Sequence, residues 1–223
     1  MTQDLSHSTL CSNLDRIAGH IKELEQQHGR EPDSVTLIAV SKRHPAKSIQ
    51  ALHGHGHVHF GESYIQEGIE KIDTLPIDIR WHFIGPLQRN KAKFLPGRFH
   101  LFHCLSSVKL AQTLQNKCEA LEVTQDLLIQ VNIGKEQSKS GVYANELDTL
   151  VGQVLDMPHL NLLGLMCMPP ICPNPEDAKP FFSSMRELRD TVAHTFEVSM
   201  PHLSMGMSHD YAQAVAEGAT IVR

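Results

Sequence analysis

Eight short apolar runs of β-strand type alternate with helical patterns along most of the chain, and this alternation restricts the possible folds more than any other feature. The predicted strands are residues 35–42, 57–61, 79–84, 99–105, 126–133, 160–168, 203–206 and 219–223. Helical segments are predicted between them at 45–52, 64–75, 90–95, 107–121, 144–155, 175–194 and 208–217. Strands that alternate with helices form parallel sheets. Eight such units predict an α/β fold of the single-domain (β/α)8 TIM-barrel type.

An open, doubly wound sheet is the alternative arrangement of the same elements. No Gly-x-Gly-x-x-Gly sequence follows the first predicted strand, so the dinucleotide-binding fingerprint of that fold is missing. Apolar residues from Leu10 to Leu24 recur at spacings of four and three, which predicts an amphipathic helix. We expect residues 1–30 to pack as an extra N-terminal helix on a barrel formed by residues 31–223. A barrel of this type would continue beyond Arg223 with a final helix, so we expect that the end is either truncated or disordered.

The composition argues against several classes of partner and site. With a net charge of −5 and scattered Lys and Arg residues, the chain lacks the basic surface that nucleic acids require. No apolar run reaches the roughly 18 residues of a membrane span, and no signal-peptide pattern opens the chain. We therefore expect a cytoplasmic protein, as a monomer or weak homodimer. The cysteines include no Cys-x-x-Cys pair, which argues against a disulfide framework or a zinc site.

Lys42 ends the first predicted strand, at the carboxyl end where ligands of barrel proteins bind. An amine reacts with a carbonyl only when it is deprotonated, which partial burial or neighbouring cations promote. Lys42 is therefore a candidate for covalent attachment of an aldehyde, although a lysine at a strand end often simply reaches solvent.

The stretch Ser204-Met-Gly-Met-Ser208 leads from the seventh predicted strand toward a helix. A glycine between serines at such a place offers hydroxyl and backbone N–H groups to an anion, and barrel phosphate sites commonly follow strands seven and eight. The other interpretation is that Ser208 only caps the helix and Gly206 only allows a tight turn. Together with Lys42 on the same face, the stretch predicts a site for an aldehyde that carries a phosphate, and pyridoxal 5'-phosphate fits this description.

Several motifs in order along the chain resemble the YggS/PROSC family of pyridoxal phosphate homeostasis proteins. They are Ala39-Val-Ser-Lys42, Phe60-Gly-Glu62, Trp81-His-Phe-Ile-Gly85, Gln130-Val-Asn132, Ser138-Lys-Ser-Gly141, Gly164-Leu-Met166, Ser204-Met-Gly-Met-Ser208 and Glu217-Gly-Ala-Thr-Ile-Val-Arg223. The resemblance covers the chain from about residue 10. It implies a barrel similar to the N-terminal domain of alanine racemase.

The resemblance also implies the roles of individual residues. Lys42 is expected to hold the cofactor covalently as an aldimine, Ser204, Gly206 and Ser208 to hold its phosphate, and Arg223 to approach its pyridine nitrogen. An arginine cannot protonate that nitrogen as a carboxylic acid would, so carbanion chemistry is less favoured. The implied function is non-catalytic, with the cofactor held as a Schiff base and delivered to pyridoxal phosphate-dependent apo-enzymes.

Two departures from the family pattern concern the site. Ser63 stands where the family usually has asparagine, so a contact to the ring hydroxyl is expected to be lost or bridged by water. The family continues after the position of Arg223 with an Ile-Gly-Thr-type turn that supplies further phosphate donors, so phosphate affinity would be lower without it.

Several histidines and one lysine remain open to two interpretations. His82 lies inside an apolar strand, where it can face the cofactor or be a satisfied core residue. Alternate histidines at positions 53, 55, 57 and 59 can present metal ligands on one strand face, but the glycines between the first three favour a solvated turn. Lys139 can meet an anion or simply be exposed.

Two other functions compete with the cofactor carrier. One is an amino-acid racemase or decarboxylase of the same barrel type, although those enzymes use a second domain or partner subunit. The other is a barrel with a decayed cofactor site that acts through a protein partner.

Overall fold

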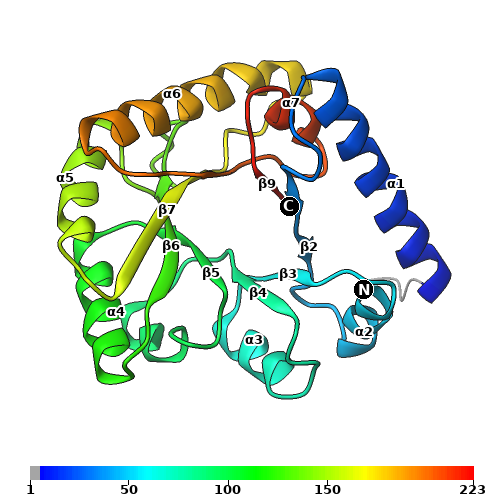
Figure 1. Ribbon diagram of the computed structural model, residues 1–223, viewed down its shortest axis with the longest axis horizontal. Helices are drawn as coiled ribbons and strands as arrows, with labels where there is room; N and C mark the ends of the chain where they lie inside the picture. The colour runs from blue at the N-terminus through cyan, green and yellow to red at the C-terminus, as the bar shows by residue number, and fades with distance from the viewer. Residues whose placement is uncertain (1–5) are drawn as a thin grey trace.

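A closed ring of parallel strands forms the centre of the computed structural model, which describes residues 6–223 (Figure 1). The strands are β1 (Thr36–Leu37), β2 (Ala39–Val40), β3 (His59–Glu62), β4 (Arg80–Phe83), β5 (Leu101–Leu105), β6 (Gln125–Val131), β7 (Leu160–Cys167), β8 (His202–Ser204) and β9 (Ile221–Val222). Their order is β1-β9-β8-β7-β6-β5-β4-β3-β2. Because only Ile38 separates β1 from β2, the two ends of this sheet are one interrupted strand, and the predicted eight-stranded barrel is confirmed.

Helices follow the strands and surround the ring (Figure 1). They are α1 (His7–Gln27), α2 (Ala46–Gly54), α3 (Ile65–Ile72), α4 (Val108–Ala120), α5 (Ala144–Leu155), α6 (Lys179–Thr195) and α7 (Tyr211–Ala216), with 3-10 turns at Arg89–Phe94 and Pro175–Ala178. The Ser107 hydroxyl accepts a hydrogen bond from the Leu110 N–H and caps the start of α4.

The start of α7 was predicted wrongly. We expected a helix from Ser208, but α7 begins at Tyr211 with Asp210 as its N-cap. The Asp210 carboxylate accepts a hydrogen bond of 2.7 Å from the Met207 N–H, which holds residues 207–210 in a turn before the helix. The interpretation of Ser208 as an N-cap is therefore also wrong.

The N-terminal helix α1 packs against α2 and α7. His20 Nδ1 lies 2.7 Å from the hydroxyl oxygen of Tyr211 in α7. At the other end of α1, the buried Glu25 carboxylate accepts hydrogen bonds from the Asp33 and Val35 N–H groups. This carboxylate holds the chain as it leaves the helix and enters the first strand.

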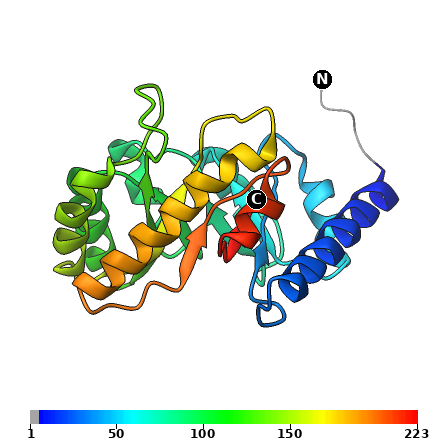
Figure 2. The ribbon, with the colours of Figure 1, turned by 90° about the horizontal axis from the view of Figure 1, so that it is seen from above.

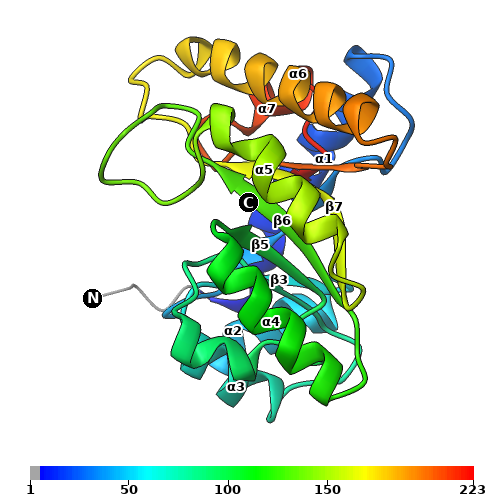
Figure 3. The same ribbon diagram turned by 90° about the vertical axis from the view of Figure 1, so that its left-hand side faces the viewer.

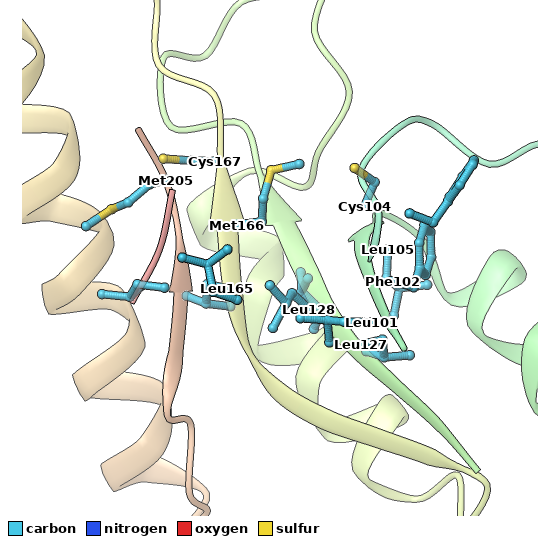
Figure 4. Packing of buried hydrophobic residues seen from close by; sticks show 14 of the residues in the cluster. Leu101, Phe102, Cys104, Leu105, Leu127, Leu128, Leu165, Met166, Cys167 and Met205 are labelled. Atoms are coloured by element: carbon cyan, nitrogen blue, oxygen red, sulfur yellow. The ribbon is translucent and has the colours of Figure 1, made fainter. Parts of the chain in front are cut away.

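The core lies between the strands and the outer helices. Leu127, Leu128 and Leu165, seen in Figure 4, are fully buried. Burial of each such side chain stabilises the fold by roughly 1.5–3 kcal/mol. Among residues 6–223, no helix is long and apolar enough to cross a membrane.

Candidate functional site

The carboxyl ends of the strands bring the predicted site residues to one face of the barrel. Lys42 follows β2, Ser63 follows β3, Ser208 follows β8 and Arg223 follows β9. Figure 1 places the C-terminal residue inside the ring of helices, next to β2. The loops after β6 (green) and β7 (yellow) project from the molecule in the same direction (Figures 2 and 3). This face therefore has both the candidate residues and the longest loops.

Lys42 has an exposed side chain and makes no hydrogen bond or ion pair with any other residue that the structure describes. Its neighbours, in contrast, are firmly held. Ser41 is buried, and Arg43 has a positive φ of 63°, which non-glycine residues seldom adopt. An unpaired amine thus projects from a fixed turn.

A buried network, which we call the Lys71 network, holds this turn. The Lys71 ammonium donates hydrogen bonds of 2.7 Å to the Ser41 carbonyl, Glu62 Oε1 and Glu67 Oε1. The Ser41 hydroxyl also donates to Glu62 Oε1, and the Arg43 N–H donates to Glu67 Oε1. Both residues that flank Lys42 are therefore tied to the same ammonium and its two carboxylates.

Glu62 is the most buried charge in the Lys71 network, with no exposed surface. Burial raises the pKa of its carboxyl, while hydrogen bonds from Lys71 and Ser41 oppose this shift. Its second oxygen, Oε2, is buried and has no hydrogen-bond partner among the described residues. The carboxylate consequently depends on Lys71 for most of its stabilisation.

The turn from Gly206 to Asp210 combines a glycine with positive φ and an exposed serine. Gly206 has φ of 93°, and a Cβ placed on it would lie 2.6 Å from the Ala214 Cβ, so only glycine fits without strain. Ser208 is exposed, and its backbone N–H makes no hydrogen bond with another described residue. The N–H of Met207, in contrast, is occupied by Asp210.

Ser204 and Arg223 meet inside the barrel. Arg223 donates hydrogen bonds to the Ser204 hydroxyl, at 2.6 Å, and to the Cys167 carbonyl, at 3.1 Å. Burial lowers the pKa of the guanidinium, but arginine stays charged at neutral pH. The Ser204 hydroxyl also bonds to His103. Ser204 is thus engaged below the glycine turn and supports Arg223.

His82 and Ser63 occupy different depths of the barrel. His82 is buried within β4, and its ring nitrogens lie 2.9 Å from His59 Nδ1 and 3.0 Å from His103 Nε2. With both nitrogens occupied, His82 can affect a ligand only through its neighbours. Ser63 lies at the rim, where its carbonyl oxygen is so close to Gly85 that a Cβ on that residue would clash with it. That glycine therefore allows the two loops to approach.

The other candidates have structural partners. His53 bonds to Asp78, His55 to Asp15, and His57 to the His59 carbonyl, so the alternate histidines do not share a face. No group of three His, Cys, Asp or Glu side chains within 6–223 is placed to hold a metal ion. Lys139 donates to the Pro169 carbonyl and pairs with Glu136.

Sequence reasoning missed the Lys71 network and the histidine neighbours of His82. The spacing of Glu67 and Lys71 at i and i+4 signals an ion pair, but nothing local points to Glu62 as its third member. The fit of the whole site to an aldehyde that carries a phosphate rests on the unpaired Lys42 amine, the glycine turn and the Arg223 guanidinium.

Comparisons with known proteins are consistent with this geometry. Residues 12–223 match the family model described as "Alanine racemase, N-terminal domain". A pyridoxal phosphate homeostasis protein of Aquifex aeolicus is 41% identical over 214 residues, which cover 96% of this chain and 94% of that protein. PipY of Synechococcus elongatus, solved with pyridoxal phosphate bound, is 33% identical with a TM-score of 0.79, covering 91% of this chain and 96% of its own. A protein of unknown function from Bifidobacterium adolescentis has a TM-score of 0.92 at 28% identity, covering 100% of this chain and 95% of its own.

Proposed function

Because this chain belongs to the family of pyridoxal phosphate homeostasis proteins, we propose that it binds pyridoxal 5'-phosphate through Lys42 and takes part in the homeostasis of this cofactor. The observation that carries the proposal is the combination of an unpaired Lys42 amine with a rigid turn around it. When bound, the cofactor supplies an aldehyde that an amine can take up and release reversibly.

We assign each residue of the site a part in binding. The Lys71 network fixes the turn, so that little backbone conformational entropy is lost when Lys42 engages the aldehyde. The glycine turn and Ser208 would receive the phosphate, while Asp210 keeps the turn in shape. Arg223, held by Ser204 and the Cys167 carbonyl, would face the pyridine nitrogen.

We further propose that the protein carries the cofactor without catalysing a reaction. A guanidinium cannot donate a proton to a pyridine nitrogen as readily as a carboxylic acid, so the residue at Arg223 does not favour carbanion chemistry. We propose an N-terminal helix within residues 1–30, of which residues 1–5 lie outside the described part of the chain, packed on a barrel of residues 31–223. We also propose a cytoplasmic location and transfer of the cofactor to apo-enzymes that depend on it.

Borohydride reduction followed by peptide mass mapping tests the binding site. The purified protein is incubated with pyridoxal phosphate and reduced, and a phosphopyridoxyl group is expected on Lys42. The variant Lys42→Ala should lose this adduct, whereas Lys117→Ala, which changes an exposed lysine of α4, should retain it. Absence of an adduct on Lys42 despite excess cofactor would overturn the proposal.

A second experiment separates the carrier from an enzyme. The loaded protein is incubated with a panel of L-amino acids, and D-isomers and amines are measured against free pyridoxal phosphate. We expect rates no higher than those of the free cofactor. Clear turnover would contradict the carrier and indicate a racemase or decarboxylase.

A further inference from the structure

Three histidines form a continuous hydrogen-bonded chain across the interior of the barrel, which we call the histidine chain: His59, His82 and His103. His59 Nδ1 lies 2.9 Å from His82 Nε2, and His82 Nδ1 lies 3.0 Å from His103 Nε2. His103 Nδ1 then lies 2.8 Å from Ser204 Oγ, which accepts from Arg223. The histidine chain thus ends at the side chains that we place in the cofactor site.

The strand register explains how the histidine chain crosses the barrel. His82 is paired with Gly61, two residues beyond His59, and His103 lies two residues beyond Leu101, the partner of His82. Each step therefore moves two residues toward the carboxyl ends of the strands. The chain rises from the first residue of β3 to the last residue of β8.

The Arg223 end of the chain determines where each proton lies. A neutral imidazole has one N–H donor and one acceptor nitrogen. Ser204 is fully buried and already accepts from Arg223, and the other described partner of its hydroxyl is His103. If His103 also donated to Ser204, the hydroxyl proton would have no acceptor, which is costly in a buried site. The hydroxyl therefore donates to His103 Nδ1, and all three rings carry their proton on Nε2.

The surroundings keep the rings neutral. Burial is the main cause that lowers the pKa of His59 to about 4 and those of His82 and His103 well below the usual value. The charges and titratable groups that face them act in the same direction: Arg80, His57, His100, His202 and Arg223. A neutral chain can pass a proton along without keeping a buried charge.

The outer end of the chain reaches water. His59 is only partly buried, and its Nε2 has no hydrogen-bond partner among the residues described. Near it, His100 lines an open cavity of about 340 Å³ at the amino ends of β4, β5 and β6. This end lies opposite the proposed cofactor site.

We propose that the histidine chain is a proton relay that connects Ser204, at the cofactor site, with solvent at the opposite end of the barrel. The relay itself follows from the hydrogen bonds, whereas its use by a phosphate-bearing ligand rests on the proposed function. It lets the site gain or lose a proton without opening the face where the ligand binds.

The transfer balances for one proton. The Ser204 hydroxyl proton moves to His103 Nδ1, the His103 Nε2 proton to His82 Nδ1, the His82 Nε2 proton to His59 Nδ1, and the His59 Nε2 proton to water. Ser204 Oγ takes a replacement proton from a monoprotonated phosphate monoester at the glycine turn, and each ring ends with its proton on Nδ1 instead of Nε2. One proton leaves the ligand, one reaches solvent, and the three rings remain neutral.

Nuclear magnetic resonance of nitrogen-labelled protein, without added cofactor, tests the relay. A long-range proton–nitrogen correlation spectrum reports which ring nitrogen is protonated, and we expect Nε2 in all three histidines. In His59→Gln, solvent exchange of the Nε2 protons of His82 and His103 should slow by about tenfold or more, because it would then require local opening. A proton on Nδ1 in any of the three rings would overturn the proposal.

The matched control is His100→Gln, since the His100 ring lies 5.4 Å from that of His82, measured between centroids, but makes no hydrogen bond in the chain. Its exchange rates should stay within about twofold of the unaltered protein. Equal exchange in His59→Gln and in the unaltered protein would also overturn the relay. If His59→Gln does not fold, the position of the ring protons in the unaltered protein still tests the relay, which requires Nε2 to be protonated in all three histidines. If the nuclear magnetic resonance results contradict the relay but borohydride reduction still labels Lys42, the relay is wrong and the proposed function is not affected.

Discussion

Replacing Lys71 with methionine removes the cation from the Lys71 network without leaving a large cavity. Lys71→Met would leave the fully buried Glu62 carboxylate with a single hydrogen bond, from the Ser41 hydroxyl. The Ser41 carbonyl and the Glu67 carboxylate would lose a donor as well. The change therefore strands a buried charge, which is among the more damaging single substitutions.

The expected loss follows from this burial. Removing one partner of a buried ion pair typically costs about 3–5 kcal/mol, and Glu67 adds little because it is partly exposed. The loss is limited because Glu62 can take up a proton, and its pKa is already raised by burial. We expect the free energy of unfolding to fall by about 3 kcal/mol at pH 8.

The loss should depend on pH with a definite sign. Without Lys71 the folded-state pKa of Glu62 rises further above its unfolded value, because the hydrogen bond and the charge that lower it are gone. In the window between the two pKa values the folded protein binds the extra proton, so stability decreases as pH increases. The defect of Lys71→Met should thus be larger at pH 8 than at pH 5.

Urea unfolding measures these values, with the fluorescence of Trp81, the single tryptophan, as a buried reporter. Adding Glu62→Gln to Lys71→Met removes the stranded charge and should recover about half of the loss or more. The control Lys117→Met, at an exposed position, should stay within about 0.5 kcal/mol. A loss below about 1 kcal/mol that is equal at both pH values would refute the buried-charge argument.

Three further predictions concern other parts of the chain. Gly206→Ala should destabilise the protein by about 2 kcal/mol or more and weaken cofactor binding, because Gly206 has a positive φ and a new Cβ would lie too close to the Ala214 Cβ. In the control Gly19→Ala, in α1, the new Cβ meets no atom, so the free energy of unfolding measured in urea should rise by about 0.5–1 kcal/mol. Stability should fall as pH decreases from about 6.5 toward 4, because the unfolded chain takes up protons that the folded histidine chain excludes. His59, with its pKa lowered to about 4, should contribute a slope that screening limits to about 1 kcal/mol per pH unit, and His82 and His103 should add to the total slope, which urea unfolding measures. The buried Cys167, whose pKa is raised to about 12, should react with thiol reagents only when the protein unfolds. The partly exposed Cys172 should react in the native protein, and peptide mapping after timed labelling would distinguish the two cysteines.

The alternation of strands and helices was enough to predict the barrel, because both periods are local properties of the sequence. The interruption at Ile38 was not predictable in this way. It arises because β1 pairs with β9 while β2 pairs with β3, so the two halves of one strand have different neighbours. The start of α7 was also missed. The Asp210 side chain accepts a hydrogen bond from the Met207 N–H, and this local side-chain contact holds residues 207–210 in a turn instead of a first helical turn from Ser208.

The sequence made Lys42 and the glycine turn candidates because each follows a strand, but it did not reveal what holds them. Glu62 contacts Lys71 only when β3 and α3 pack together. In the sequence, nothing but its charge distinguishes either residue, so the pair could not be predicted. His82 was recognised as ambiguous for the same reason. Its neighbours His59 and His103 come from β3 and β5, and only the register of a closed barrel aligns them.

The two buried polar systems differ in charge, and this difference suits the reversible binding that we propose for the site. The Lys71 network is ionic and fixes the backbone on both sides of Lys42, so the Lys42 side chain starts from a fixed backbone position while its amine stays unpaired among the described residues. The histidine chain is neutral and contacts the site only through Ser204 and Arg223. Because neither system uses the Lys42 amine itself, the site keeps its shape whether or not the amine is engaged. Reversible binding then requires no rearrangement of buried charges, whose desolvation would otherwise slow each cycle.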